Sequence, residues 1–191
     1  MSYSELKIVG CYLITQKVFP DERGLFREWF RSSEIAEFDS RFSIQQASIS
    51  HSKRGVIRGM HFSIAPEGQS KIVTCTSGTV TDVLVDLRLG SPSFLKVATL
   101  NLSENEGLGV FIASGVGHGF QVSSAMGTMM YLTSSIYAPA QEKGISPLDP
   151  ELKIEWPISK PSEVILSEAD AHAPTLRDAE EMGILPIFLP N

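Results

Sequence analysis

Residues 71–87 read KIVTCTSGTVTDVLVDL, and this stretch decides the fold that the sequence predicts. Apolar side chains recur at every second position on both sides of a Ser-Gly-Thr break: Val73 and Cys75 precede it, and Val83, Val85 and Leu87 follow it. This alternation is typical of a β-strand with a buried face, and the short break is typical of a hairpin turn. We therefore expect two strands that pair through a turn at residues 77–79.

Short alternating segments continue on both sides of this stretch, and each ends in Gly, Asn, Ser or Pro. A spacing of about ten residues between short strands favours an all-β sandwich or barrel over a parallel α/β sheet. A turn is expected at Pro20 to Gly24. The expected strands lie within residues 5–19, 25–30, 42–52, 94–102, 108–114, 119–124 and 128–137.

Short helices are expected where a small polar residue precedes a helical pattern. They are residues 34–38 after a cap at Ser32 or Ser33, residues 168–173 after a cap at Ser167, and residues 176–182 closed by Gly183. No repeat or linker separates these last helices from the strands. Residues 1–191 are therefore expected to form a single domain.

The composition excludes several classes of protein. The chain has 191 residues with 16 Lys and Arg against 22 Asp and Glu, a formal net charge of −6, which disfavours a general nucleic-acid or anionic-membrane binder. No apolar run reaches the roughly 20 residues of a membrane span, and the N-terminus lacks a signal-peptide pattern, so a cytoplasmic protein is expected. Cys11 and Cys75 form no CxxC pair, and we expect both to be small buried residues.

Charge is concentrated in RGVIRGMHFSIAPEGQSK, residues 54–71. His61 at its centre lies between apolar neighbours, which fits either a satisfied core histidine or a base active near neutral pH. Arg54, Arg58 and Lys71 can hardly all be buried without an anionic partner. Because Arg suits bidentate phosphate contacts, these residues favour a phosphorylated ligand near His61.

A metal site is not expected. A small β-barrel with histidines suggests the cupin class, whose metal-bearing members carry two histidines in an HxH pair, but His61-Phe62-Ser63 supplies one. His118 in GVGHGF is a second, distant histidine. Two scattered histidines do not provide the three or four ligands that catalytic zinc or iron usually requires.

Three further sets of residues can each be interpreted in two ways. If residues 131–137 form one strand, Tyr131 and Tyr137 share a face, either as core residues or with a phenol that donates a proton opposite a histidine. Asp170 fits a helix-capping position after Ser167, or a carboxylate that orients a histidine base. The charged and aromatic residues of 21–28 are solvated loop residues unless this loop closes over a pocket.

Nine motifs follow one another along the chain: DERGLFREWF (21–30), QQASIS (45–50), GVIRGMHF (55–62), GQSK (68–71), DVLVDLRLGSPSF (82–94), GVGHGF (115–120), YLTSSIYAP (131–139), LDPELKIEWP (148–157) and LSEADAHAP (166–174). In this order they resemble the motifs of the dTDP-4-keto-6-deoxyglucose epimerase family, which includes dTDP-4-dehydrorhamnose 3,5-epimerases and 3-epimerases. The similarity extends from about residue 10 to residue 175.

The resemblance implies a metal-independent, cofactor-free jelly-roll cupin that acts on a dTDP-4-keto-6-deoxy sugar. It also implies a homodimer in which an N-terminal strand can reach the partner's site. His61 would be the catalytic base, Asp170 its partner, Tyr131 the acid on the opposite face of the sugar, and Lys71 a donor near the C4 oxygen. The implied substrate-binding residues are Arg23, Phe26, Glu28, Gln46, Ser48, Arg58, His118 and Tyr137.

The sequence departs from the family pattern at three places. Ser48 stands where many members have Asn, Ala169 stands where a basic residue often precedes the tail aspartate, and Ala113-Ser114 replaces the usual Pro before GVGHGF. The main hypothesis is an epimerase acting at C3, and at C5 if the sugar can be reprotonated there. The alternatives are a 3-epimerase only, a dTDP-sugar 3,4-ketoisomerase, and a non-catalytic sugar-nucleotide-binding or metal-binding cupin.

Overall fold

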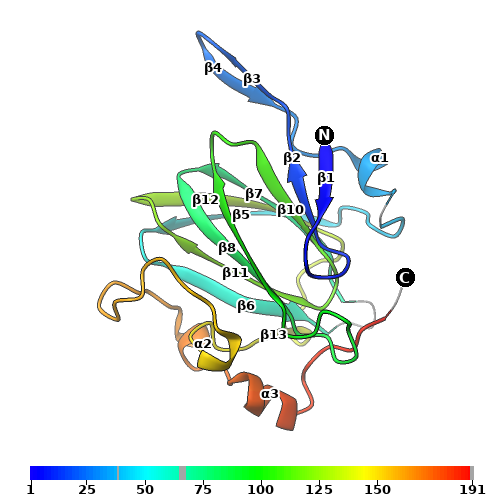
Figure 1. The fold of residues 1–191 in the computed structure, drawn as a ribbon, viewed down its shortest axis with the longest axis vertical. Helices are drawn as coiled ribbons and strands as arrows, with labels where there is room; N and C mark the ends of the chain where they lie inside the picture. Colours follow the sequence, from blue (N-terminus) through cyan, green and yellow to red (C-terminus); the bar gives the residue numbers. More distant parts are fainter. Residues whose placement is uncertain (38, 65–67, 190–191) are drawn as a thin grey trace.

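Two antiparallel sheets form the body of the protein in a computed structural model that describes residues 1–37, 39–64 and 68–189 (Figure 1). The first sheet has the strand order β1-β2-β10-β7-β12-β5: Ser2–Glu5, Tyr12–Thr15, Leu108–Ile112, Lys71–Ser77, Met126–Thr133 and Gln46–Lys53. The second has the order β13-β6-β11-β8-β9: Glu142–Gly144, Ile57–Ser63, Val116–Val122, Thr79–Asp86 and Val97–Ser103. This two-sheet architecture is the cupin-like jelly roll that the resemblance predicted, so the expected fold class is confirmed.

The predicted hairpin of residues 71–87 is wrong in its pairing, although both strands exist. β7 pairs with β10 and β12 in the first sheet, whereas β8 pairs with β9 and β11 in the second. The turn at Gly78 connects a strand of the first sheet to a strand of the second. Gly78 has a positive φ of 75°, and an added Cβ would clash with the Met126 carbonyl oxygen, so only glycine fits there. Alternation of apolar and polar residues shows that one face of a strand is buried, but it does not identify the neighbouring strand.

Apolar side chains form three buried clusters on the faces of these sheets. Val73, Cys75 and Leu84 belong to the cluster between the two sheets, where both cysteines are buried as expected. Val83 and Val85 point from the other face of β8 into a second cluster, which Leu152, Trp156 and Leu176 of the C-terminal segment cover. The third cluster joins the outer face of the first sheet to Ile35 and Phe42. β8 is therefore buried on both faces.

The helices are short. α2 (Glu168–Ala171) begins after Ser167, whose side chain accepts a hydrogen bond from the Asp170 N–H, and α3 (Leu176–Glu181) ends before Gly183, both as predicted. α1 (Ser32–Ile35) exists, but its N-cap is Arg31 without a side-chain cap, so the predicted serine cap is wrong. Its expected end at residue 38 lies outside the described residues. A 3-10 turn, η1, covers Pro150–Leu152. None of the helices in the described ranges is long and apolar enough to cross a membrane.

β3 (Val18–Asp21) and β4 (Gly24–Arg27) form a separate hairpin around the predicted turn. Figure 1 shows this hairpin projecting from the body of the protein, beyond the edge of the two sheets. Phe19, Leu25 and Phe26 on it are all exposed. Apolar side chains on a projecting hairpin are typical of a surface that meets a ligand or another subunit.

Gly59 is the glycine that most constrains the strand carrying His61. Its φ is +138°, and a Cβ there would meet Gly119 Cα at 2.5 Å and the His118 carbonyl oxygen at 2.9 Å. Gly59→Ala should lower the free energy of unfolding by about 1–3 kcal/mol through backbone strain and by about 1–3 kcal/mol more through crowding. Urea denaturation would measure this loss.

Gly24→Ala is the matched control, because Gly24 has a similar φ of +129° but no atom within 4 Å of an added Cβ. Only the strain should remain in this variant. Equal losses of stability in the two variants would contradict the steric account of Gly59.

Candidate active site

His61 and Asp170 form a hydrogen-bonded pair at one edge of the second sheet. His61 Nε2 lies 2.7 Å from Asp170 Oδ1, although the two residues are 109 positions apart in the chain. β6 supplies the histidine, and α2, which contacts β6, supplies the carboxylate. The His61 side chain is 48% exposed while that of Asp170 is 8% exposed. The imidazole is therefore open to a ligand, and its partner is shielded behind it.

The contacts of Asp170 fit both of the interpretations that its sequence position allowed. Ser167, the N-cap of α2, accepts a hydrogen bond from the Asp170 N–H through its side chain, and the Asp170 carboxylate accepts one from His61. Burial alone would raise the pKa of Asp170, but hydrogen bonds from His61, Ser167 and the Gly59 N–H, together with the charge of His61, hold that pKa below its ordinary value. An ionised carboxylate can only accept, so in the neutral form of His61 the proton is on Nε2 and the Nδ1 lone pair is left for a substrate.

Tyr131 lies on β12, in the sheet that opposes β6. Its hydroxyl is 3.0 Å from Ser50 Oγ on β5, and burial raises the pKa of the phenol well above its ordinary value. The group is therefore protonated at neutral pH and able to donate. Arg58, whose charge acts on the same phenol, is held by a 3.0 Å hydrogen bond from Nε to Ser52 Oγ.

Lys71 opens β7 in the first sheet, beside Thr133 of β12. The side chain is buried, and burial lowers the pKa of its amine, while the negative charges of Glu142 and Asp82 oppose that change. Within the described ranges, no carboxylate lies within ion-pair distance of Lys71 Nζ. The N–H donors of the amine are therefore available to another acceptor.

A second histidine–carboxylate pair lies deeper between the sheets. His118 Nε2 is 2.7 Å from Asp82 Oδ2, and both side chains are buried. The His118 ring packs edge-on against Tyr131, with 6.4 Å between ring centroids, and β11 pairs His118 with His61 of β6. His118 is therefore behind Tyr131 and is already bonded to a protein group.

The loop after β12 brings together a further part of the expected site. Gln46 donates to Ser48 Oγ at 3.0 Å and accepts from the Tyr137 N–H at 2.8 Å. Strand β12 ends at Thr133, so the condition under which Tyr131 and Tyr137 would share a strand face is not met. The Tyr137 side chain is instead exposed in the loop, next to Gln46.

Three expected binding residues are not brought to His61 within one chain. Arg23 and Phe26 lie on the projecting β3–β4 hairpin, and Glu28 follows it (Figure 1). Arg23 pairs with Asp21 at 2.5 Å, and Glu28 pairs with Arg31. Within one chain, these three residues therefore lie apart from the group that forms around His61.

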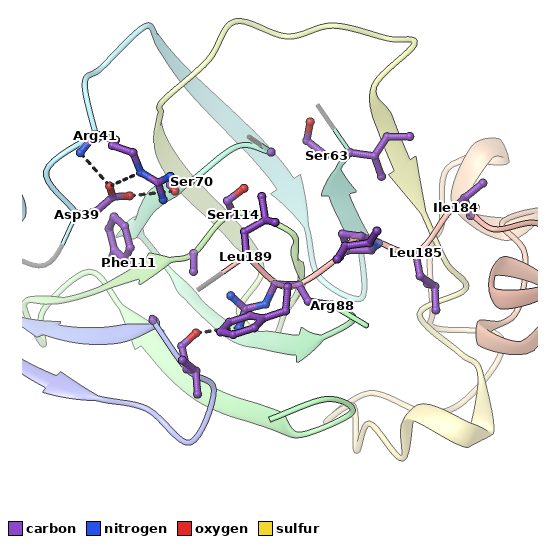
Figure 2. Close-up of a pocket in the computed structure, with 18 of the residues that line it drawn as sticks. Asp39, Arg41, Ser63, Ser70, Arg88, Phe111, Ser114, Ile184, Leu185 and Leu189 are labelled. Atoms are coloured by element: carbon purple, nitrogen blue, oxygen red, sulfur yellow. Dashed lines mark hydrogen bonds and ion pairs between the residues drawn. The ribbon is translucent and has the colours of Figure 1, made fainter. Parts of the chain in front are cut away.

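A cavity of about 620 Å³ lies beside the residues of the site without containing His61, Tyr131 or Lys71. Figure 2 shows it between Asp39, Arg41 and Ser70 on one side and Arg88 and the C-terminal residues on the other. Ser63 and Ser70, which line it, are neighbours of the site on β6 and before β7. Elsewhere in the described chain, no three His, Cys, Asp or Glu residues are grouped as metal ligands.

The match to a family model decides the classification. The model described as dTDP-4-dehydrorhamnose 3,5-epimerase matches residues 5–178. The chain belongs to the dTDP-4-dehydrorhamnose 3,5-epimerase family. The epimerase is thus an isomerase, as the motifs predicted.

Individual relatives agree with this family assignment. The epimerase is 43% identical over 189 residues to a dTDP-4-dehydrorhamnose 3,5-epimerase of Mycolicibacterium smegmatis, covering 98% of this chain and 92% of the relative. Its structure resembles that of NovW, a 4-keto-6-deoxy sugar epimerase from Streptomyces spheroides, with a TM-score of 0.93, 41% identity, and 98% and 94% of the two chains covered.

A third relative carries a ligand. This is ChmJ, a 3'-monoepimerase from Streptomyces bikiniensis in complex with dTDP-quinovose. The TM-score is 0.90 at 37% identity, and 95% of this chain and 91% of that one are covered. Solved relatives therefore include an enzyme described as acting at one centre.

Several residues at the site were missed by the sequence analysis. Asp82, Ser50, Ser52 and Glu142 all contact or electrically influence an expected catalytic or binding residue. Asp82 had a detectable signal, because it is an acid that alternates with the buried Val80 and Leu84 on one face of its strand. The serines alternate along β5 in the manner of a polar cavity wall, but this pattern does not identify what each serine bonds.

Proposed function

We propose that this protein inverts C3, and by a second cycle C5, of a dTDP-4-keto-6-deoxyhexose in deoxysugar biosynthesis. The observation that carries the proposal is the 2.7 Å His61–Asp170 pair, which leaves an exposed imidazole facing the sheet that holds Tyr131. Inversion needs a base on one face of the sugar and an acid on the other. Inversion at C3 alone is the second candidate, supported by the similarity to a 3'-monoepimerase.

The proposed first step is proton abstraction beside the C4 ketone. His61 Nδ1 removes the C3 proton, while Asp170 holds the ring through Nε2 and stabilises the imidazolium that forms. The electron pair of the broken C–H bond moves into an enolate, whose negative charge gathers on the C4 oxygen. Lys71 donates to that oxygen, as an oxyanion donor in a site largely shielded from water.

The proposed second step returns a proton to C3 from the opposite face. Tyr131 donates it, because its phenol is protonated and its strand lies across from β6. The proton acquired by His61 leaves to solvent and Tyr131 is reprotonated, so neither step changes the oxidation state. The configuration at C3 is inverted.

Substrate binding is proposed to use both the interior and a second protomer. Arg58 would contact the diphosphate, as Arg suits bidentate phosphate contacts, and Gln46, Ser48 and Tyr137 would contact the sugar and nucleotide. His118 would support the sugar through Tyr131. In a homodimer, Arg23, Phe26 and Glu28 of one protomer would enter the site of the other, which accounts for a projecting hairpin with exposed aromatic residues.

Mixed dimers would test this shared site. A His61→Ala chain and an Arg23→Ala/Phe26→Ala chain should each be inactive or weakly active alone. After unfolding and refolding together, they should recover roughly a quarter of wild-type activity, because half of the dimers contain one complete site. Activity that stays at the sum of the separate variants would place the hairpin at its own chain's site or at none.

Incubation with dTDP-4-keto-6-deoxyglucose in deuterium oxide tests the function itself. Deuterium at C3 and C5 supports the double epimerase, and deuterium at C3 alone supports the single one. Absence of label at both positions would refute an epimerase of this substrate. The reaction is proposed to take place in the cytoplasm, where two free buried thiols such as Cys11 and Cys75 remain reduced.

A further inference from the structure

Ser50 contacts the proposed proton donor from the edge strand of the first sheet. In the ladder between β5 and β12, Ser50 lies opposite Met129 and Tyr131 lies opposite Ser48. Ser50 and Tyr131 are therefore diagonal neighbours on one face, and their hydroxyl oxygens are 3.0 Å apart. Met129 belongs to the cluster between the sheets and Tyr131 packs against it, so this is the inner face of the sheet.

The chemistry proposed for Tyr131 fixes the direction of this hydrogen bond. Either hydroxyl could donate when no substrate is bound. A phenol that gives its proton to C3 points its hydrogen at the sugar, and its oxygen gains negative charge as the proton leaves. Ser50 is then the donor, because each hydroxyl has one hydrogen and that of the phenol is already used. The Ser50 hydrogen is thus directed at charge that develops only during the reaction.

The other groups around Tyr131 act on its ring or through their charge. His118 packs edge-on against the ring and is bonded to Asp82 through Nε2, while Arg58 influences the phenol through its charge. Among the described residues, Ser50 is the one hydrogen-bond partner of the Tyr131 hydroxyl. Burial raises the pKa of this phenol, and the hydrogen bond with Ser50 opposes that rise. Direct stabilisation of a phenolate therefore comes from Ser50.

We propose that Ser50 is a positioning residue for Tyr131: it holds the phenol oxygen, turns the phenol hydrogen toward the sugar, and donates to the phenolate that forms when C3 is reprotonated. This inference rests on the proposed function and on Tyr131 as its acid. In that step the Tyr131 O–H bond breaks, its proton joins C3, and the enolate electron pair forms the new C–H bond. The negative charge passes to the phenol oxygen, where the Ser50 hydrogen bond stabilises it until a solvent proton neutralises it.

Ser50→Ala should slow inversion without slowing proton removal by His61. In deuterium oxide, the ratio of C3 epimer formed to deuterium incorporated at C3 should fall by about 10–100-fold, as is typical when a hydrogen bond to a charged group is lost. KM for dTDP-4-keto-6-deoxyglucose should stay near the wild-type value. Ser50→Thr keeps a hydroxyl and should restore the wild-type ratio, which a defect in the packing of β5 would not allow. Ser50→Gly is a second variant without the hydroxyl if Ser50→Ala fails to fold.

Thr128→Val is the matched control. Thr128 Oγ1 lies 2.7 Å from His51 Nδ1 across the same two strands, but on the opposite face, since His51 is next to Ser50 in β5. Its ratio of epimer to incorporated deuterium should equal that of the wild type. A wild-type ratio in folded Ser50→Ala, an equal fall in Thr128→Val, or no recovery in Ser50→Thr would overturn the inference alone. Wild-type protein that incorporates no deuterium would refute the proposed function, and this role of Ser50 with it.

Discussion

Replacement of His61 by Ala should abolish deuterium incorporation into dTDP-4-keto-6-deoxyglucose. His61 supplies the only exposed imidazole that is paired with a buried carboxylate in the described structure, and no other described group bonded to Asp170 is a base near neutral pH. Loss of a general base typically costs about 10²–10⁴-fold in rate. Exchange at C3 should therefore fall by at least this factor, as measured by NMR of the recovered sugar nucleotide.

The matched control is His172→Ala. His172 follows α2, two residues after Asp170, and its ring forms a hydrogen bond with the Glu168 carbonyl. Its replacement therefore removes an imidazole near the dyad and leaves the His61–Asp170 bond in place. This variant should exchange at nearly the wild-type rate. Wild-type exchange by a folded His61→Ala protein would show that another group is the base.

Tyr131→Phe should separate proton removal from inversion. The substitution keeps the ring that packs against His118 and removes only the hydroxyl, which can return a proton from the face opposite His61. His61 can still remove the C3 proton and return deuterium to the same face. The variant should therefore incorporate label with retained configuration, while formation of the C3 epimer falls by about 10²–10⁴-fold.

Tyr12→Phe serves as the corresponding control. Tyr12 lies on β2, where its ring packs against Phe111 in the cluster on the outer face of the first sheet. Removal of this hydroxyl should leave the ratio of epimerisation to exchange unchanged. If Tyr131→Phe lost exchange and epimerisation equally, its hydroxyl would act in proton removal or in binding, and the assignment of the acid would be wrong.

The sequence located the strands better than it paired them. Alternating apolar side chains predict strands at residues 71–76 and 80–87, and the structure has them at 71–77 and 79–86. The same pattern fits any neighbouring strand that covers the same face. The partner of each strand depends on packing between segments far apart in the chain. A local sequence pattern contains no information about that packing. The short connection at Gly78 therefore looked like a hairpin when it is a crossing between sheets.

The residues of the site show the same limit: their identity can be predicted from local motifs, but most of their contacts with distant residues cannot. His61 and Asp170 were linked through the resemblance, because each lies in a motif with its own spacing, and the structure brings them to 2.7 Å. The His118–Asp82 pair was not expected, since neither residue indicates its partner 36 positions away. Arg23 and Phe26 show a further limit: their motif resembles one that binds substrate, but within one chain they lie on the projecting hairpin and not beside His61.

Asp170 belongs to the C-terminal segment that carries α2 and α3, and not to either sheet. The layer carrying α2 and α3 packs on the outer face of the second sheet, away from the cluster between the sheets. Partial detachment of this layer, by mild denaturant or heat, would remove the carboxylate from His61 while the sheets persist. We therefore expect loss of activity on heating to precede unfolding of the two sheets.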